Sequence, residues 1–300
     1  MELAPVGIST YARLGHLGRT IDALKRNTLA SRTELFVFSD APRPGDEAAV
    51  AAVRRYAHEI DGFRTVHVVE RDENSRVRNS RGGMRQLLDT YGKTIFMEED
   101  IVTSPVFLAY MNDALHRYAD VGDIFSISGY CPPFEIPEDF RDDVFALPRF
   151  NGWGFGIWKD RFDSIDLHLD RSEVVQRLRN PLEVLRFTRG GWDMLRMLAD
   201  DMNGRIDALD VKIFYQQYVQ GRTTVYPVKS LVSNTGYDGS GIHCGASDRF
   251  DVQRWDADTY TWTLPDRPSM PPEIVRAHAR FWSGGPWRKL RHLKKFIRRL

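Results

Sequence analysis

Three acidic side chains follow an apolar segment about one third of the way along the chain. In "KTIFMEED" (93–100), two large apolar residues are followed directly by Glu98, Glu99 and Asp100. The apolar part is typical of a buried strand. Successive strand residues point to opposite sides, so we do not expect all three carboxylates to bind one ion. One carboxylate together with ligand phosphates is a common site for Mg²⁺ or Mn²⁺, and the other two can accept hydrogen bonds from hydroxyl groups. The alternative is an acidic turn exposed to solvent.

Two further segments contain residue types that suit catalysis or ligand binding. Asp193 in "RGGWDML" (189–195) begins a helical pattern, where it is either a general base or an acid of the first helical turn. "TGYDGSGIHCG" (235–245) is rich in glycine, and such loops close over substrates. In this loop Asp238 is a candidate for acceptor contacts, and His243 is a candidate for contacts with a metal ion or a diphosphate. The alternative for both is a solvated loop position.

The aromatic segment "FNGWGFGIWKDRF" (150–162) offers rings that can stack on a sugar. Its alternating spacing is also typical of a strand in a core. We therefore expect Trp158 in the core and keep Trp153 as a candidate platform for an acceptor sugar. Asp200 and Asp201, in the following helix, are expected on a solvated face.

The first hundred residues alternate between strand and helix patterns. Strands are predicted at 5–11, 33–40, 63–70 and 93–99, and helices at 14–29, 45–60 and 79–92. This alternation predicts an α/β protein with right-handed crossovers and a mostly parallel sheet, in which ligands bind beyond the carboxyl ends of the strands. Arg13, Asp40 and the acidic triplet follow such ends, so we expect a site there.

The remaining chain has a different organisation. A helix with Pro105 in its first turn is predicted at 104–119, a strand at 123–130, a helix at 191–204 and a strand at 224–234. We expect a nucleotide-sugar-binding half at 1–104, an acceptor-binding half at 105–250 and an extension at 251–300. The alternative is one sheet that crosses the boundary near 101–105.

Composition places the chain among globular proteins. It has 42 Lys and Arg residues against 41 Asp and Glu residues, so its charge gives no reason to expect a nucleic-acid partner. We find no signal-peptide pattern and no run of about 18 apolar residues. The two cysteines have no zinc-type spacing. We expect a cytoplasmic protein.

The segment "WRKLRHLKKFIRRL" (287–300) has seven Lys or Arg residues and no acid. Apolar residues recur in it at three- and four-residue spacing, from Trp287 to Leu300. This pattern predicts a basic amphipathic helix that binds peripherally at the inner face of the plasma membrane. The alternative is a helix that packs on the acidic remainder of the chain.

Residues 5–247 resemble bacterial GT-A glycosyltransferases, of the family-2-like type found in surface-polysaccharide gene sets. More distantly they are similar to N-acetylglucosaminyltransferase I. The segments that carry the resemblance include "GISTYARLGHLGRTIDALKRNT", "FVFSDAP", "EEDIVTSPVFLAYMNDAL", "WGFGIWKDRF", "RGGWDMLRML" and "VYPVKSLVSNTGYDGSGIHC". The resemblance implies a Rossmann-like nucleotide-binding half whose sheet continues into an acceptor-binding half. It also implies a metal-dependent, inverting transfer of a sugar from a nucleotide-diphosphate sugar, expected to be a UDP-sugar, to a glycan or lipid-linked acceptor, with Asp193 as general base.

The resemblance further implies roles around the triplet. Asp100 coordinates the Mn²⁺ or Mg²⁺ that bridges the donor phosphates, Glu99 faces the ribose, and Glu98 faces the hydroxyls of the donor sugar. Asp40 and Arg13 lie against the nucleotide base.

The chain departs from its relatives at "RDENSRVRNS" (71–80), where a Gly-Leu pair is usual. Arg76 and Arg78 in this segment are candidates for contacts with the diphosphate. A sugar nucleotidyltransferase is an alternative function, although "GISTYARLGHLG" lacks the Gly-rich basic loop that such enzymes need. A non-catalytic carbohydrate- or nucleotide-binding protein is another. No P-loop or dinucleotide-binding motif follows a predicted strand.

Overall fold

The computed structural model describes residues 2–240, 246–252, 254–255, 259 and 261–299. Its main feature is an eight-stranded sheet with the order β3-β2-β1-β4-β8-β6-β9-β7. The strands are β1 (Val6–Thr10), β2 (Glu34–Ser39), β3 (Thr65–Glu70), β4 (Lys93–Glu98), β6 (Ile124–Ser128), β7 (Val144–Leu147), β8 (Phe155–Trp158) and β9 (Thr223–Pro227). β1 to β4 are mutually parallel, which confirms the predicted α/β class.

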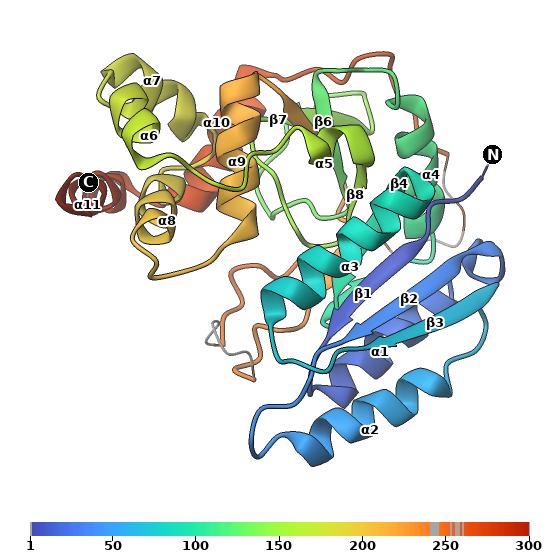
Figure 1. Cartoon of the computed structure of the whole chain (residues 1–300). Helices are drawn as coiled ribbons and strands as arrows, with labels where there is room; N and C mark the ends of the chain where they lie inside the picture. Colours follow the sequence, from blue (N-terminus) through green and yellow to red (C-terminus); the bar gives the residue numbers. More distant parts are fainter. Residues whose placement is uncertain (1, 241–245, 253, 256–258, 260, 300) are drawn as a thin grey trace.

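Helices α1 (Leu14–Lys25), α2 (Glu47–His58) and α3 (Arg76–Tyr91) connect the parallel strands, and a 3₁₀ turn (Ala30–Arg32) precedes β2. Residues alternate along β2: Leu35 and Val37 pack in the cluster that contains α1 and α2, whereas Phe36 and Phe38 pack with α3. The helices therefore cover both faces of the sheet (Figure 1). An apolar strand between two helical layers explains why these segments read as apolar runs.

The sheet continues across residues 101–105. β8 lies antiparallel between β4 and β6, β9 is parallel to β6, and β7 is antiparallel to β9. The predicted strand at 224–234 is wrong as a single element, because β9 ends at Pro227 and the chain turns before β10 (Val232–Asn234). β10 pairs with β5 (Ile101–Thr103), directly after the acidic triplet. The fold thus joins the glycine-rich segment to the triplet.

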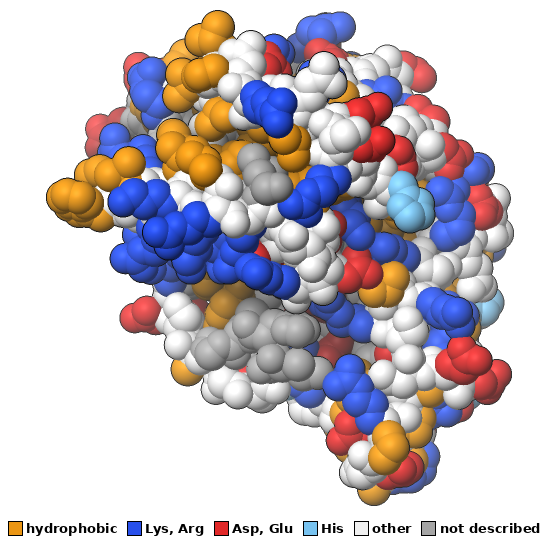
Figure 2. All heavy atoms as spheres, turned by 60° about the vertical axis from the view of Figure 1, so that its left-hand side comes forward, with side chains coloured by type: hydrophobic (Ala, Val, Ile, Leu, Met, Phe, Trp, Pro, Cys, Tyr) orange, Lys and Arg blue, Asp and Glu red, His pale blue; other side chains and the backbone are white. Residues whose placement is uncertain are grey.

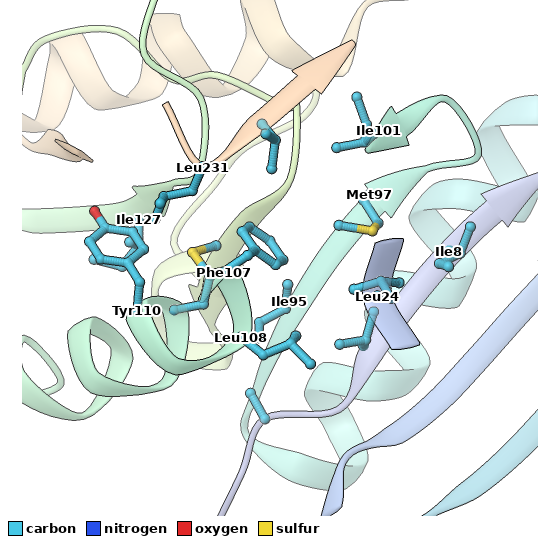
Figure 3. Packing of buried hydrophobic residues seen from close by; sticks show 14 of the residues in the cluster. Ile8, Leu24, Ile95, Met97, Ile101, Phe107, Leu108, Tyr110, Ile127 and Leu231 are labelled. Carbon is cyan, nitrogen blue, oxygen red and sulfur yellow. The ribbon is translucent and has the colours of Figure 1, made fainter. Parts of the chain in front are cut away.

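The core beneath this junction is apolar (Figure 3). Phe107, at the start of α4 (Phe107–Arg117), packs among Ile95, Met97, Ile127 and other buried residues. α4 begins after Pro105, so the prediction that this proline lies in the first helical turn is wrong. Residues 104–106 instead form a tight turn in which Phe107 N donates to Ser104 O. Trp158 is buried and its Nε1 donates to Leu115 O, which confirms its predicted place in the core.

A helical layer flanks the β7 side of the sheet (Figure 1). After the short α5 (Lys159–Asp163) come α6 (Arg171–Leu178), α7 (Pro181–Phe187), a 3₁₀ turn (Thr188–Gly190), α8 (Asp193–Met202), α9 (Leu209–Gln220), α10 (Pro272–Ser283) and α11 (Pro286–Arg299). α6 to α9 share an apolar cluster of their own, into which α11 inserts the buried Phe296. No described helix is long and apolar enough to span a membrane.

Asp200 and Asp201 are not on a solvated face, and that prediction is wrong. Asp200 is buried and forms an ion pair with Arg299 of α11. Asp201 Oδ1 accepts a hydrogen bond from Ala208 N at 2.9 Å. The two acids therefore hold α11 and the start of α9 against α8.

Candidate active site

The acidic triplet lies at the carboxyl edge of the parallel strands, as predicted. β4 ends at Glu98, and Glu99 and Asp100 form a turn. Arg13 Nε donates to Glu99 Oε1 at 2.9 Å and Arg13 Nη2 donates to Asp100 Oδ2 at 2.7 Å. The expectation that successive carboxylates point to opposite sides is therefore wrong for this pair, because strand geometry ends at Glu98. One guanidinium fixes both carboxylates.

Asp100 retains an unused ligand atom. Its Oδ1 is buried and has no hydrogen-bond partner within the described chain, although Oδ2 is bound by Arg13. A buried carboxylate oxygen without a partner is costly unless a ligand satisfies it. The described residues contain no group of three or more His, Cys, Asp or Glu side chains arranged for a metal ion. The geometry therefore fits a hard cation that takes one protein oxygen and completes its shell with ligand oxygens.

The triplet also has unusual proton affinities. Glu98 is exposed to solvent at the strand end, yet it sits in a hollow of the protein. Desolvation there, followed by the charges of Asp100 and Glu99, raises its pKa to about 8. Burial likewise raises the pKa of Glu99, against the opposing effect of Arg13. Three acids so close together favour either a bound proton or a bound cation.

The described part of the glycine-rich loop, residues 235–240, lies against the triplet. Thr235 N and Oγ1 both donate to Asp100 O, at 2.9 and 3.1 Å. A Cβ on Gly236 would lie 2.1 Å from Asp100 Oδ2, so only glycine allows this approach. Asp238 lies at α1, 3.1 Å from His16 Nε2. Its pKa is lowered to about 2, chiefly by the Ser240 hydroxyl. The other loop candidate, His243, lies outside the described residues.

Asp40 is buried at the end of β2, beside Arg13 and its strand. Its Oδ1 accepts from Ala41 N at 3.0 Å and from Ser75 N at 2.9 Å, and Oδ2 accepts from Asn74 Nδ2 at 3.3 Å. The carboxylate thus fixes the loop before α3, which forms the rim of the predicted nucleotide site.

The two arginines that distinguish this chain from its relatives have different positions. Arg78 pairs with the exposed Glu73 at 2.6 Å. Arg76 Nη2 donates to Asp207 O at 3.2 Å, and its charge lowers the proton affinity of Glu98. Of the two, Arg76 faces the site.

A cavity of about 580 Å³ contains Asp193, the predicted base. Arg149 holds both oxygens of this carboxylate, Nη1 to Oδ1 at 3.0 Å and Nη2 to Oδ2 at 2.9 Å. The guanidinium lies 3.9 Å from the ring centroid of Trp282 in α10. Bidentate pairing and stacking together fix Asp193 at the start of α8.

Trp153 lines the same cavity, as expected for a sugar platform. Its ring is held edge to face by Tyr130, Tyr237 and Phe250, with centroid distances of 4.6, 5.6 and 5.5 Å. The three contacts fix the orientation of the indole. Tyr237 directly follows Gly236, so the wall of the cavity continues from the loop that covers Asp100.

Asp210 was missed from the sequence. It is the second residue of α9, lines the cavity, and has no hydrogen bond or ion pair with any described residue. Desolvation raises its pKa, opposed by the charges of Arg149 and Arg76, and its own charge raises the pKa of Glu98. Asp210 therefore lies between the triplet and Asp193 and makes one continuous site of the two. Its position in the first turn of a helix reads as an ordinary capping acid in the sequence.

The wall opposite Asp193 comes from the extension. Trp282, Arg288, Arg291 and Lys295 all line the cavity. Trp192 N donates to Ser283 Oγ at 2.9 Å, which docks the end of α10 beside Asp193. The basic pattern of residues 287–300 was the only sequence signal for this wall, and it gave no indication of what the helix faces.

The sequence matches no family model and no curated protein. In fold the chain is similar to three solved structures. One is the mannosyltransferase PcManGT from Pyrobaculum calidifontis in complex with GDP-Man and Mn²⁺ (19% identity, TM-score 0.38, 53% of this chain and 46% of that chain). The second is S. aureus TarS 1-349 (9% identity, TM-score 0.43, 78% and 61%). The third is GalNAc-T7 with UDP, GalNAc and Mn²⁺ (10% identity, TM-score 0.45, 75% and 42%). Each match covers less than two thirds of the other chain. The functional argument therefore rests on the site.

Proposed function

We propose that this protein is a metal-dependent glycosyltransferase that moves a sugar from a nucleotide-diphosphate sugar, with UDP-sugars as the first donors to test, to a glycan or lipid-linked acceptor. The observation that supports it most is the orphaned Asp100 Oδ1 at the carboxyl edge of the parallel strands. It lies next to a cavity that contains two carboxylates, Asp193 and Asp210. One part of the site suits a cation with a diphosphate, and the other suits an acceptor.

Asp100 would hold the Mn²⁺ or Mg²⁺, and the ion would stabilise the charge that develops on the leaving diphosphate. The chain's own residues prepare this site. Arg13 fixes Asp100 and Glu99 through the contacts described above, which leaves Glu98 to accept hydrogen bonds from the donor sugar. Glu99 faces the ribose, and Asp40 and Arg13 border the base, as the resemblance implies. Gly236 and Thr235 cover Asp100 and exclude water from it.

Inverting transfer needs one carboxylate that takes the proton of the acceptor hydroxyl as its oxygen attacks the sugar. Asp193 remains our first candidate because it lies in the cavity opposite the aromatic platform. Asp210 is a second candidate, since its oxygens are free and its raised pKa suits a base, whereas both oxygens of Asp193 already accept from Arg149.

Asp193→Asn and Asp210→Asn, measured under saturating donor, separate the two candidates. The variant of the base loses about 10²–10⁴-fold in kcat and retains donor affinity. If neither variant loses more than the other loses in KM, the cavity does not supply the base.

Release of nucleoside diphosphate from a panel of nucleotide sugars, with Mn²⁺ and with EDTA, tests the function itself. We expect metal-dependent release that Asp100→Asn abolishes. Asp22→Asn, a change of equal charge on the exposed face of α1, should retain it. A nucleotidyltransferase would instead form sugar nucleotide from a sugar phosphate and a nucleoside triphosphate. A binding protein would bind donor with no release.

We also propose that α11 contacts an anionic membrane surface. The amphipathic stripe is divided in the structure: Phe296 is buried in the body, whereas Trp287 and Ile297 are 81% and 63% exposed, beside the exposed Lys294 and Arg298. Packing on the body and contact with lipid thus use different sides of one helix. An aromatic and an aliphatic side chain flanked by cations suit the interface of an anionic leaflet.

Co-sedimentation with anionic and neutral vesicles tests this contact. Trp287→Ser with Ile297→Ser should weaken binding to anionic vesicles. Leu182→Ser with Leu185→Ser, at 67% and 57% exposed positions of α7, should not. Equal binding by both double variants contradicts the proposal. Surface substitutions are preferable to removal of α11, because removal would uncover the cluster around Phe296.

A further inference from the structure

The cavity beside Asp193 has a large excess of positive charge. Six Lys or Arg side chains line it, from four separate segments of the chain, against the two carboxylates. Figure 2 shows Lys and Arg side chains gathered on the face of the molecule that carries the α11 side of Figure 1, with hydrophobic side chains beside them. A cavity for a neutral sugar needs hydroxyl acceptors and an aromatic surface, and it needs no such excess of cations.

The protein does not balance these charges itself. Arg288, Arg291 and Lys295, one turn apart along α11, form no ion pair or hydrogen bond with any described residue. Arg196 Nε and His292 Nδ1 are buried in the same region without a partner. Arg149 is the exception, because Asp193 neutralises it. Unpaired cations that face one another in a concave site cost free energy, which a bound anion recovers.

The mutual repulsion is visible in neighbouring groups. Burial, followed by the charge of Arg288, lowers the pKa of Arg249. Burial also lowers the pKa of His292, and Arg196, Arg288 and Lys295 add to this effect against the charge of Asp193. The positive potential therefore extends through the cavity from α8 to α11.

We propose that the acceptor carries a phosphate or diphosphate group, and that Arg196, Arg288, Arg291 and Lys295 bind this group. The inference rests on the proposed function, because it takes the cavity as the acceptor site. The phosphate group lies against α11, and the hydroxyl that receives the sugar lies toward Asp193 and Asp210. Guanidinium groups match phosphate oxygens in pairs, and a multiply charged phosphate uses several cations where a single carboxylate needs one or two.

Isothermal titration with inorganic pyrophosphate, in EDTA and without donor, tests the site directly. The double variant Arg291→Gln with Lys295→Gln removes two cavity charges. Lys294→Gln with Arg298→Gln removes two exposed charges from the solvent side of the same helix. We expect the first pair to weaken pyrophosphate binding at least about tenfold and the second to leave it unchanged, because only cavity cations make charge-assisted hydrogen bonds to the ligand. Equal affinities of the two double variants, or no binding by the wild type, would overturn the proposal.

A second arm identifies the source of the phosphate. Flotation with phosphatidylcholine vesicles, with and without phosphatidic acid, compares the same two double variants. Selective loss in Arg291→Gln with Lys295→Gln indicates that a lipid headgroup reaches the cavity, and equal flotation indicates a soluble phosphorylated acceptor. Pyrophosphate binding requires no transferase activity. It can therefore fail while nucleoside diphosphate release succeeds, or succeed while release fails.

Discussion

Gly236→Ala is the smallest change that tests the arrangement around Asp100. The added Cβ would lie 2.1 Å from Asp100 Oδ2 and 2.9 Å from its Cγ, about 1 Å or more short of an ordinary contact. Asp100 cannot move away without loss of the 2.7 Å bond from Arg13. The loop cannot move without loss of the bonds from Thr235 to Asp100 O. A displacement of about 1 Å in a catalytic group costs on the order of 10²-fold in rate, and we expect that loss in kcat/KM for the donor.

The assay is nucleoside diphosphate release with Mn²⁺, together with calorimetric donor affinity. Gly122→Ala is the matched control, because a Cβ there has no heavy atom within 4 Å and the residue is remote from the triplet. Thermal melts of both variants verify that the fold is retained. If Gly236→Ala has the activity and donor affinity of the control, then Asp100 does not need its observed position, and its assignment to the metal is wrong.

Three other predictions follow from buried contacts. Arg149→Gln leaves Asp193 without its partner, and we expect about 3–5 kcal/mol less stability in urea unfolding and slower transfer; unchanged stability contradicts the buried pairing. Asp200→Asn weakens the hold of Arg299, so amide exchange along α11 should accelerate, whereas exchange in β1 should not. Burial holds the pKa of His278 well below its usual 6.5, so the unfolded chain alone takes up the proton in mild acid. Stability should then fall by about 1.4 kcal/mol per pH unit below 6.5, and His278→Gln should lack this slope.

The donor half could be predicted from sequence because its signals are local. Each parallel strand is a short apolar run and each connecting helix repeats its apolar residues every three or four positions, so their order follows without knowledge of contacts. The predicted bounds of β1 to β4 differ from the observed ones by two residues or fewer. The topology then brings Arg13, Asp40 and the triplet to one edge without further information.

The acceptor side could not be predicted because its contacts join distant segments. Arg149 meets Asp193 across 44 positions, and Arg299 meets Asp200 across 99. Neither partner of such a pair has a sequence signature, and each acid reads as an ordinary helix-surface residue. Asp210 was missed for the same reason. The break between β9 and β10 also depends on a distant contact, since Leu231 N donates to Gly129 O at 2.8 Å.

The two sides of the site rest on different apolar clusters. Strands β1, β2 and β4 share one with α1 and α4, whereas α8 and α11 share another built around Phe296. Substitutions that reshape the cationic wall are absorbed in the second cluster and leave the first unchanged. In evolution, such a division lets acceptor preference diverge rapidly by drift in α8 and α11 while the donor machinery stays under constant selection. For the engineer, α10 and α11 form a cassette, and exchanging residues 272–299 between related chains is the direct way to transplant one acceptor preference onto another donor site.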